Sequence, residues 1–335
     1  MKNNYYYNIG CFSEGLARAR LNGKYGYINE NYEVIIDFKY DYACYFSEGL
    51  AQVRLNDKYG FINKNDEVII DFKYDGAWSG FSEGLAPVVL NGKWGFIDKS
   101  GKEITDFKYD DTGHFSEGLA SVRLNEKYGF INKNDEVIID FKYDYTGHFS
   151  EGLVWVMLND KYGFIDKSGR EITDFKYDYA ESFSNGLAFV RLNGKYGFID
   201  KTGKEVIPIK YDSIWNSKHR LLKNFKVGLV RVKLNDKYGF IDRNGIEVIP
   251  LKYDYAEFFS EELACVKLND KYGFINKNDE AIIDFRYDNV GDEKSFHNGL
   301  ALVKLNDKWF FIDKSGKEVV DRDILVTDSE TLIEV

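Results

Sequence analysis

Two histidines stand at equivalent places in two copies of a Thr-Gly-His-Phe segment, His114 and His148. If these copies belong to adjacent structural units, we expect the two imidazole rings to lie near each other. A zinc ion needs further nitrogen or sulfur ligands, and no third histidine or cysteine stands at a matching place. The pair therefore does not predict a metal site, and the sequence indicates no cofactor.

A serine recurs in Phe-Ser-Glu-Gly segments such as that of Ser82. Nucleophilic catalysis by serine needs a base within hydrogen-bond reach, and no histidine follows these serines at a recurring distance. An active site in the array would also need a cluster of residues unique to one unit. We therefore expect a protein that is not an enzyme.

Basic residues gather around one tryptophan in a segment that has no counterpart elsewhere in the chain: Trp215, Lys218, His219, Arg220 and Lys223. Because the formal net charge is −10, this cluster predicts a protein or peptide partner that is acidic at its contact face. The net charge opposes nucleic-acid binding, since phosphate contacts need positive charge. A tolerated loop insertion is the alternative interpretation.

Lys-Tyr-Asp endings recur along the chain, for instance at residues 39–41 and 73–75. They could form a track of aromatic rings and carboxylates that binds a sugar or a peptide. Alternatively, the Asp caps backbone amides of the loop while the Tyr packs on the next unit. Because the ending occurs from one end of the array to the other, we favour this structural interpretation.

A six-residue phrase explains why these motifs recur at regular intervals. Residues 24–29, Lys-Tyr-Gly-Tyr-Ile-Asn, return eight more times with few changes. Their alternation predicts a β-strand. A Gly inside a strand marks a close approach of another backbone or ring, and we expect the slot at Gly129 and its equivalents to receive an aromatic ring from a neighbouring unit. Phe310 replaces this Gly in the last copy, which is typical of an end cap.

Two further strands flank each phrase. Residues 15–21 carry small apolar side chains on one face and basic ones such as Arg20 on the other, which we expect to meet water. Asn22-Gly23 joins this strand to the phrase and predicts a type I′ hairpin. Residues 33–41 predict a third strand, from which a loop leads to the next unit.

Nine units follow one another, with 34 residues from Phe12 to Phe46 and 35 from Phe46 to Phe81. Insertions in such arrays map to loops, often on the binding face. We therefore expect a lead-in over residues 1–11, repeats over 12–320 with a long insertion around 213–223 and a short one around 290–294, and a cap or tail over 321–335.

The segment Phe81-Ser82-Glu83-Gly84-Leu85-Ala86-Pro87-Val88, followed by Gly92-Lys93-Trp94-Gly95-Phe96-Ile97-Asp98-Lys99-Ser100-Gly101, resembles the bacterial WG repeat, also called the KWG repeat. The resemblance covers residues 12 to about 320, and seven of the nine copies have Tyr in place of the signature Trp. It implies an all-β repeat protein of variable copy number. It gives no catalytic residues.

Nine antiparallel meanders of three strands would place about 27 strands in one array, whereas twisted open sheets seldom exceed ~10 strands. The array must therefore coil or close. Because propellers typically close ~4 to 8 blades, we expect an open, solenoid-like superhelix, with a closed propeller-like ring as the alternative.

Composition completes the expectation. The chain is 44% hydrophobic and 17% aromatic, as folded proteins are. No stretch resembles a signal peptide or a membrane span, so we expect a cytoplasmic protein, and the three cysteines predict free thiols. The sequence thus favours a non-enzymatic β-repeat scaffold that binds a protein or peptide partner along a groove or through the long loop, with a glycan-binding or polysaccharide-associated module as the alternative.

Overall fold

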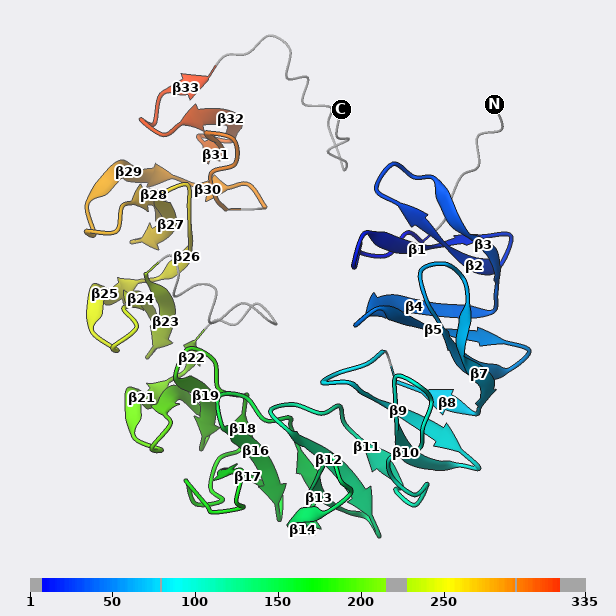
Figure 1. Cartoon of the computed structure of the whole chain (residues 1–335). Coiled ribbons are helices and arrows are strands. Elements are labelled where there is room, and N and C mark those ends of the chain that lie inside the picture. The colour runs from blue at the N-terminus through cyan, green and yellow to red at the C-terminus, as the bar shows by residue number, and fades with distance from the viewer. Residues whose placement is uncertain (1–7, 79, 215–227, 293, 320–335) are drawn as a thin grey trace. The chain divides into compact units, whose positions relative to one another are not determined.

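The computed structural model describes residues 8–78, 80–214, 228–292 and 294–319. Within these ranges the regular secondary structure consists of strands alone, which form nine antiparallel sheets of three or four strands each (Figure 1). Contacts divide the chain into a first unit, Met1–Leu192 with Asp200–Lys204, and a second unit, Asn193–Ile199 with Glu205–Val335. The nine sheets confirm the predicted all-β tandem array, and its open or closed arrangement stays a prediction.

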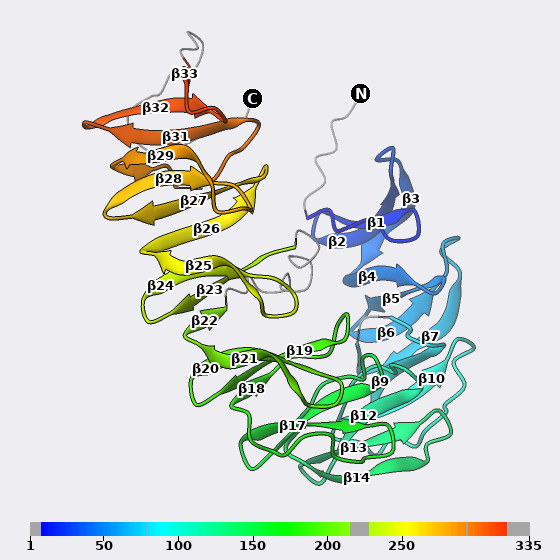
Figure 2. The same cartoon turned by 90° about the vertical axis from the view of Figure 1, so that its left-hand side faces the viewer.

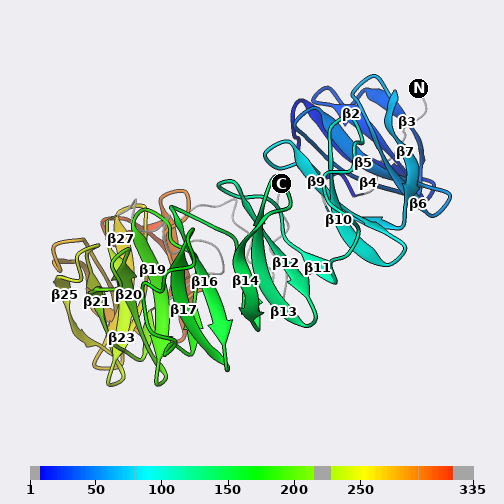
Figure 3. The ribbon, with the colours of Figure 1, turned by 60° about the horizontal axis from the view of Figure 1, so that its bottom comes forward.

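The first five sheets, numbered in chain order, belong to the first unit. Figure 3 labels strands from each of these sheets. Their strands are β1 (Leu16–Leu21), β2 (Lys24–Asn29) and β3 (Val34–Tyr40); β4 (Tyr42–Ser47), β5 (Leu50–Leu55), β6 (Lys58–Ile62) and β7 (Val68–Tyr74); β8 (Gly76–Ala77), β9 (Leu85–Leu90) and β10 (Lys93–Asp98); β11 (Asp111–Thr112), β12 (Leu119–Leu124), β13 (Lys127–Asn132) and β14 (Val137–Tyr143); β15 (Tyr145–Thr146), β16 (Leu153–Leu158) and β17 (Lys161–Asp166).

The division between the units falls in sheet 6, and sheets 7 to 9 follow in the second unit, where they lie one above another (Figure 2). These sheets contain β18 (Tyr179–Ala180), β19 (Leu187–Leu192), β20 (Lys195–Asp200) and β21 (Glu205–Tyr211); β22 (Ser213–Ile214), β23 (Val230–Leu234), β24 (Lys237–Ile241) and β25 (Glu247–Tyr253); β26 (Tyr255–Ser260), β27 (Leu263–Leu268), β28 (Lys271–Ile275) and β29 (Ala281–Tyr287); β30 (Asn289–Val290), β31 (Leu300–Leu305), β32 (Lys308–Asp313) and β33 (Glu318–Val319).

The predicted hairpin between the first two strands of each repeat is confirmed. Leu21 pairs with Lys24, and the turn residues Asn22 and Gly23 have φ of 51° and 83°. Positive φ at both central positions defines a type I′ turn. Copies with Asn-Asp keep the same geometry, since Asn56 and Asp57 have φ of 51° and 61°.

A fourth element, here called the lead strand, precedes this hairpin in sheets 2 to 9 and was missed in the sequence. In sheets 2 to 9, taken in order, the lead strands are β4, β8, β11, β15, β18, β22, β26 and β30. In sheet 2 a second tight turn joins it to β5, with Glu48 and Gly49 at φ of 53° and 89°. The segment expected to be a loop is therefore part of the sheet, and six sheets have four strands.

Sheets 3 and 5 lack a continuous third strand, which is reduced to isolated bridges. Thr105 and Thr173 stand there at the place of Ile70 in β7. The Thr105 hydroxyl accepts a hydrogen bond from the N–H of Phe96 at 2.9 Å. Because this hydroxyl competes with the backbone for the donor, the strand ladder is interrupted.

The glycine inside each central strand makes room within its own sheet, which corrects the expectation of a ring from a neighbouring unit. A Cβ atom added at Gly129 would lie 2.5 Å from the carbonyl oxygen of Ile139 on β14. The register of β13 against β14 shifts at this point. The glycine therefore accommodates an irregular approach of the third strand.

Phe310 takes this glycine's place in sheet 9 and packs on the preceding sheet. Its ring centroid lies 6.2 Å from that of Tyr287. In sheet 8 the same contact, Phe285 on Tyr253 at 6.1 Å, comes from the third strand. Phe310 thus supplies from the central strand a ring that other repeats supply from the third.

Most of the apolar clusters are shared by consecutive sheets. One cluster joins sheets 1 and 2 through Leu16, Tyr27, Ile36, Tyr40, Ala43, Phe46, Ala51, Val53 and Ile62. Because consecutive sheets bury one another, stability is approximately a sum of repeat and interface contributions. All three cysteines are free, and no helical segment in the described part of the chain has the length and apolar character of a membrane span.

Candidate binding pocket

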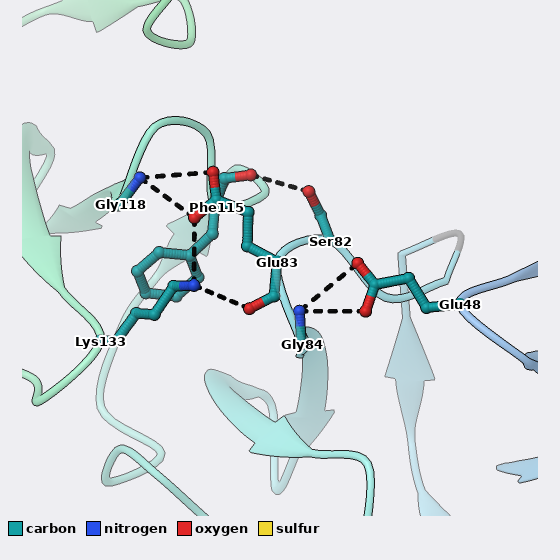
Figure 4. Close-up of polar contacts among 7 residues, drawn as sticks. All are labelled: Glu48, Ser82, Glu83, Gly84, Phe115, Gly118 and Lys133. Atoms are coloured by element: carbon teal, nitrogen blue, oxygen red, sulfur yellow. Dashed lines mark hydrogen bonds and ion pairs between the residues drawn. The ribbon is translucent and has the colours of Figure 1, made fainter.

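The recurring Ser-Glu-Gly segments join consecutive sheets (Figure 4). The Ser82 hydroxyl donates a hydrogen bond to the carbonyl oxygen of Phe115 at 2.8 Å. The Glu83 carboxylate accepts one from the N–H of Gly118 at 3.1 Å and lies 3.2 Å from the Lys133 ammonium. The same serine bond recurs at Ser13, Ser47, Ser116, Ser150 and Ser260. These polar residues therefore hold the stack together.

The Asp of the Lys-Tyr-Asp ending connects two hairpins. Asp41 accepts a hydrogen bond from the Lys24 ammonium of sheet 1 and another from the N–H of Asn56 in sheet 2, the second at 3.0 Å. The bond from Lys24, joined by the Asn56 amide and partly opposed by desolvation, holds the pKa of Asp41 below 3.8. The Asp caps a loop amide, which confirms the structural interpretation.

The Tyr of the same ending is buried, and its hydroxyl depends on the next turn. Tyr40 donates to the Asp66 carboxylate at 2.6 Å, and burial together with this bond raises the pKa of Tyr40. Where the next turn is Ser-Gly, the carboxylate is missing. The hydroxyls of Tyr74 and Tyr143 accordingly lack a partner among the described residues.

The basic side chains expected to face water do so only in part. Arg20 is exposed, but Arg54 and Arg123 are half-buried. Their guanidinium carbons lie 5.8 Å from the ring centroids of Tyr59 and Tyr128. These tyrosines belong to the next strand of the same hairpin, so the ladder consists of cation–π pairs on the sheet surface.

A hollow of about 660 Å³ opens in the first unit beside the lead strands of sheets 2 to 5. Its wall includes the rings of Tyr45, Tyr145 and Trp155 and the side chains of His114 and His148. Tyr45 is 47% and Tyr145 56% exposed. None of the described residues that line it is Asp, Glu, Lys or Arg. Aromatic walls with a few polar groups are typical of ligand sites.

The two histidines line one pocket, as their equivalent positions predict. His114 is half-buried, and its Nδ1 atom lacks a hydrogen-bond partner among the described residues. Desolvation holds the pKa of His114 below 6.5, and the nearby His148 lowers it further. Both causes favour the neutral form of the His114 imidazole. No cluster of three or more His, Cys, Asp or Glu in the described ranges could hold a metal ion.

Two glycines shape the wall of the pocket. A Cβ atom at Gly113 would lie 2.6 Å from the Ser121 hydroxyl, and one at Gly147 would lie 2.5 Å from Nε1 of Trp155. Both glycines directly follow two-residue lead strands, β11 and β15, whereas β4 and β26 run for six residues. The two Thr-Gly-His segments are evident in the sequence. Their place at the pocket wall could not be inferred, because the lead strands that position them were not predicted.

The residues expected to bind a partner lie outside the described residues: Trp215, Lys218, His219, Arg220 and Lys223. Of the insertion expected around 213–223, the structure describes Ser213–Ile214, which form β22. The role of the five candidate residues in partner binding stays a prediction. The pocket is instead built from residues that the sequence offered only as metal-ligand candidates or as members of repeats.

The sheet order and the contacts between consecutive sheets define a tandem β-repeat protein in which recurring polar residues serve the stack. The family described as WG containing repeat matches residues 5–25, 25–59, 59–94, 94–128, 128–162, 162–196, 196–219, 238–272 and 272–309. The chain belongs to this family.

Two solved structures are similar to the chain at low identity. A crystal structure of the eukaryotic initiation factor is 11% identical, with 84% of this chain and 87% of that chain covered and a TM-score of 0.49. Hsv2 of Kluyveromyces lactis is 8% identical, with 93% and 98% covered and a TM-score of 0.37. No curated protein matches the chain. Likenesses of this degree carry no argument about function.

Proposed function

We propose that this chain is a non-enzymatic scaffold that binds a protein or peptide partner. One observation carries the proposal: polar groups of the repeated motifs are engaged between sheets, while the first unit keeps an open pocket with exposed aromatic rings. Part of the pocket wall comes from positions at which the residue type differs from one repeat to the next, such as Ser121 and Trp155. Repeat scaffolds commonly bind partners on such surfaces.

The composition of the pocket suits an anchor side chain of a partner. Interfaces draw most of their binding energy from a few side chains that fill desolvated pockets, with a polar rim around them. Tyr45, Tyr145 and Trp155 supply apolar area, and His114 and Ser121 supply polar atoms. The pocket is therefore suited to one side chain and the backbone next to it.

The alternative is a glycan-binding module, and one feature favours it. Trp78 is 48% exposed, and its ring centroid lies 6.0 Å from that of Trp94. The exposed ring of Trp78, with the half-buried Trp94 beside it, offers a surface on which sugar rings can stack. The pair lies on sheet 3 of the first unit, so it could act together with the pocket or apart from it.

A parallel screen separates the two functions. The full chain would be tested against a random peptide display library and against a glycan array, with a Trp155→Ala, Tyr145→Ala variant as the control. We expect saturable binding of peptide clones that the control variant loses, and no retention of glycans. A chain that retains glycans and selects no peptide would contradict the proposal. Shortening residues 213–223 in a third sample tests whether the insertion contributes.

A further inference from the structure

The second unit shows how a cation fits beside a lead strand. The Arg231 side chain on β23 is 6% exposed, and its guanidinium carbon lies 4.5 Å from the ring centroid of Phe258 on β26. The guanidinium donates to the carbonyl oxygen of Ala256 and lies 3.3 Å from the Glu257 carboxylate. One arginine thus fills the space between the hairpin of sheet 7 and the lead strand of sheet 8.

Sheets 4 and 5 of the first unit repeat this frame without the cation. Ser121 on β12 holds the place of Arg231, because each pairs with the phenylalanine of the next strand in its hairpin. His148 holds the place of Phe258, since both stand directly before a Phe-Ser segment. A small side chain where the second unit has an arginine leaves space, and both Ser121 and His148 line the hollow.

The lead-strand carbonyl at this place takes a donor in other sheets. Arg18 donates to the carbonyl of Ala43 at 2.9 Å, and Gln52 donates to that of Ala77 at 3.2 Å. The equivalent residue in sheet 5 is Thr146, which lines the pocket. Ser121 donates no comparable bond among the described residues. The frame therefore offers an acceptor for a donor that the chain itself does not supply.

Hydrogen-bond capacity in the pocket also favours a donor. The hydroxyls of Ser47, Ser82 and Ser116 line the pocket and donate to the carbonyls of Phe81, Phe115 and Phe149. Their hydrogens are thus engaged, while their oxygens keep lone pairs that can accept. A ligand rich in N–H groups fits such a wall better than a ligand rich in acceptors.

Charge points the same way. Aromatic faces attract cations, and the attraction grows when the cation is desolvated. The pocket has no lysine or arginine of its own among the described lining residues, and the net charge of −10 attracts basic partners to the protein as a whole. Guanidinium is planar and carries five N–H donors, so it can stack and donate at once, which an ammonium does less well.

We propose that the pocket binds the guanidinium of an arginine side chain from the peptide partner, in the place that Arg231 fills in the second unit. This inference rests on the proposed function and names the chemistry that the pocket selects. It is separate from the acidic partner surface expected at residues 213–223, which concerns another part of the chain.

The test uses the full chain and a synthetic peptide, acetyl-Gly-Gly-Arg-Gly-Gly-amide, with a Gln analogue as the uncharged control. The chain has four histidines, so their ring proton signals can be followed by NMR during titration. We expect the Arg peptide to shift the signals of His114 and His148 saturably and the Gln peptide to bind at least ten times more weakly.

Two variants make the result specific. Ser121→Arg gives the pocket its own guanidinium, as in the second unit, and should weaken binding of the Arg peptide at least tenfold. Asn31→Arg adds the same charge at an exposed turn of sheet 1 and should leave binding unchanged. Equal binding of the Gln peptide, or undiminished binding by Ser121→Arg, would overturn the inference.

The screen described above keeps the two proposals apart. If selected peptides bind the chain but do not compete with the Arg peptide, the scaffold function stands and the arginine pocket is wrong. If no peptide binds and glycans are retained, both proposals fail.

Discussion

The pocket of the first unit and the Arg231 site of the second are the same place in the repeat with different contents. In the second unit an arginine lies against Phe258 and beside Glu257. In the first unit the equivalent residues are Ser121, His148 and Gly147, and a hollow results. The repeat thus tolerates a large change at this place, because the strands that frame it are held by contacts elsewhere.

Those contacts are the same in both units, so the pocket and the Arg231 site can be compared on the same backbone frame. The Ser-Glu-Gly bonds, the Asp bonds between hairpins and the shared apolar clusters recur on either side of the division. Differences in binding between the two places therefore follow from the few residues that differ.

Removing the buried cation should have the largest effect. Arg231→Ser leaves the Glu257 carboxylate, whose side chain is 20% exposed, without its cationic partner, although the Tyr255 hydroxyl still donates to it. Breaking such an ion pair typically costs about 3 kcal/mol. The free energy of unfolding would be measured by urea denaturation.

The control is the reciprocal change in the first unit. Ser121→Arg adds a guanidinium where there is space, so the free energy of unfolding should change by less than about 1 kcal/mol. An equal loss in both variants would mean that the two places are not alike.

A methyl group at the pocket wall should have the next largest effect. Gly147→Ala would place Cβ 2.5 Å from Nε1 of Trp155, and overpacking of this kind costs about 1–3 kcal/mol. Because the clash is with one ring, the double variant Gly147→Ala, Trp155→Ala should lose less than the sum of the two single variants. Additive losses in urea denaturation would show that the glycine serves another contact.

Acid should weaken capture in the first unit. Burial and the nearby His148 lower the pKa of His114, so this imidazole keeps its neutral form to a lower pH than usual and gains its proton only on acidification. A cation in the pocket then meets the positive charge of His114, which lines the pocket together with His148. We expect the affinity for the Arg peptide to be constant near pH 7 and to fall about tenfold on acidification, or ~1.4 kcal/mol.

The matched control replaces both imidazoles by an uncharged amide. A His114→Gln, His148→Gln variant should bind the Arg peptide with an affinity that no longer depends on pH in this range. If the pH dependence persists in that variant, it arises elsewhere on the protein.

The strands, turns and polar contacts that occur in every repeat could be predicted from the sequence, because the same residues recur in each copy. Alternation gave the two strands of the hairpin, Asn22-Gly23 gave its turn, and the recurrence of Asp41 and Tyr40 gave their structural role. The short lead strands could not be predicted, because a strand of two residues carries no alternation. The Glu48-Gly49 turn resembles Asn-Gly and was the one signal that could have revealed them.

The pocket could not be predicted for a related reason. It arises from the coincidence of Ser121 in one sheet with Gly147 and His148 in the next, and a single sequence does not show that these residues meet. The contacts of Gly129 could not be predicted either, since the crowding there comes from its own sheet and not from the neighbouring sheet. Sequence periodicity fixes what repeats, whereas the candidate site depends on where the repeats differ.

The smallest expected effect concerns the turn that follows each lead strand. In sheet 8 this turn is Glu261-Glu262, and Glu262 has φ of 76° at a position that is Gly49 in sheet 2. A non-glycine residue in the left-handed region costs about 1 kcal/mol, so Glu262→Gly should raise the free energy of unfolding by about that amount. A Cβ atom at Gly49 would meet nothing within 4 Å, so Gly49→Glu isolates the same backbone cost with the opposite sign. Opposite shifts of similar size in urea denaturation would show that the turns of the two units are equivalent, whereas a loss of stability in Glu262→Gly would show that the Glu262 side chain makes a contact that outweighs its strain.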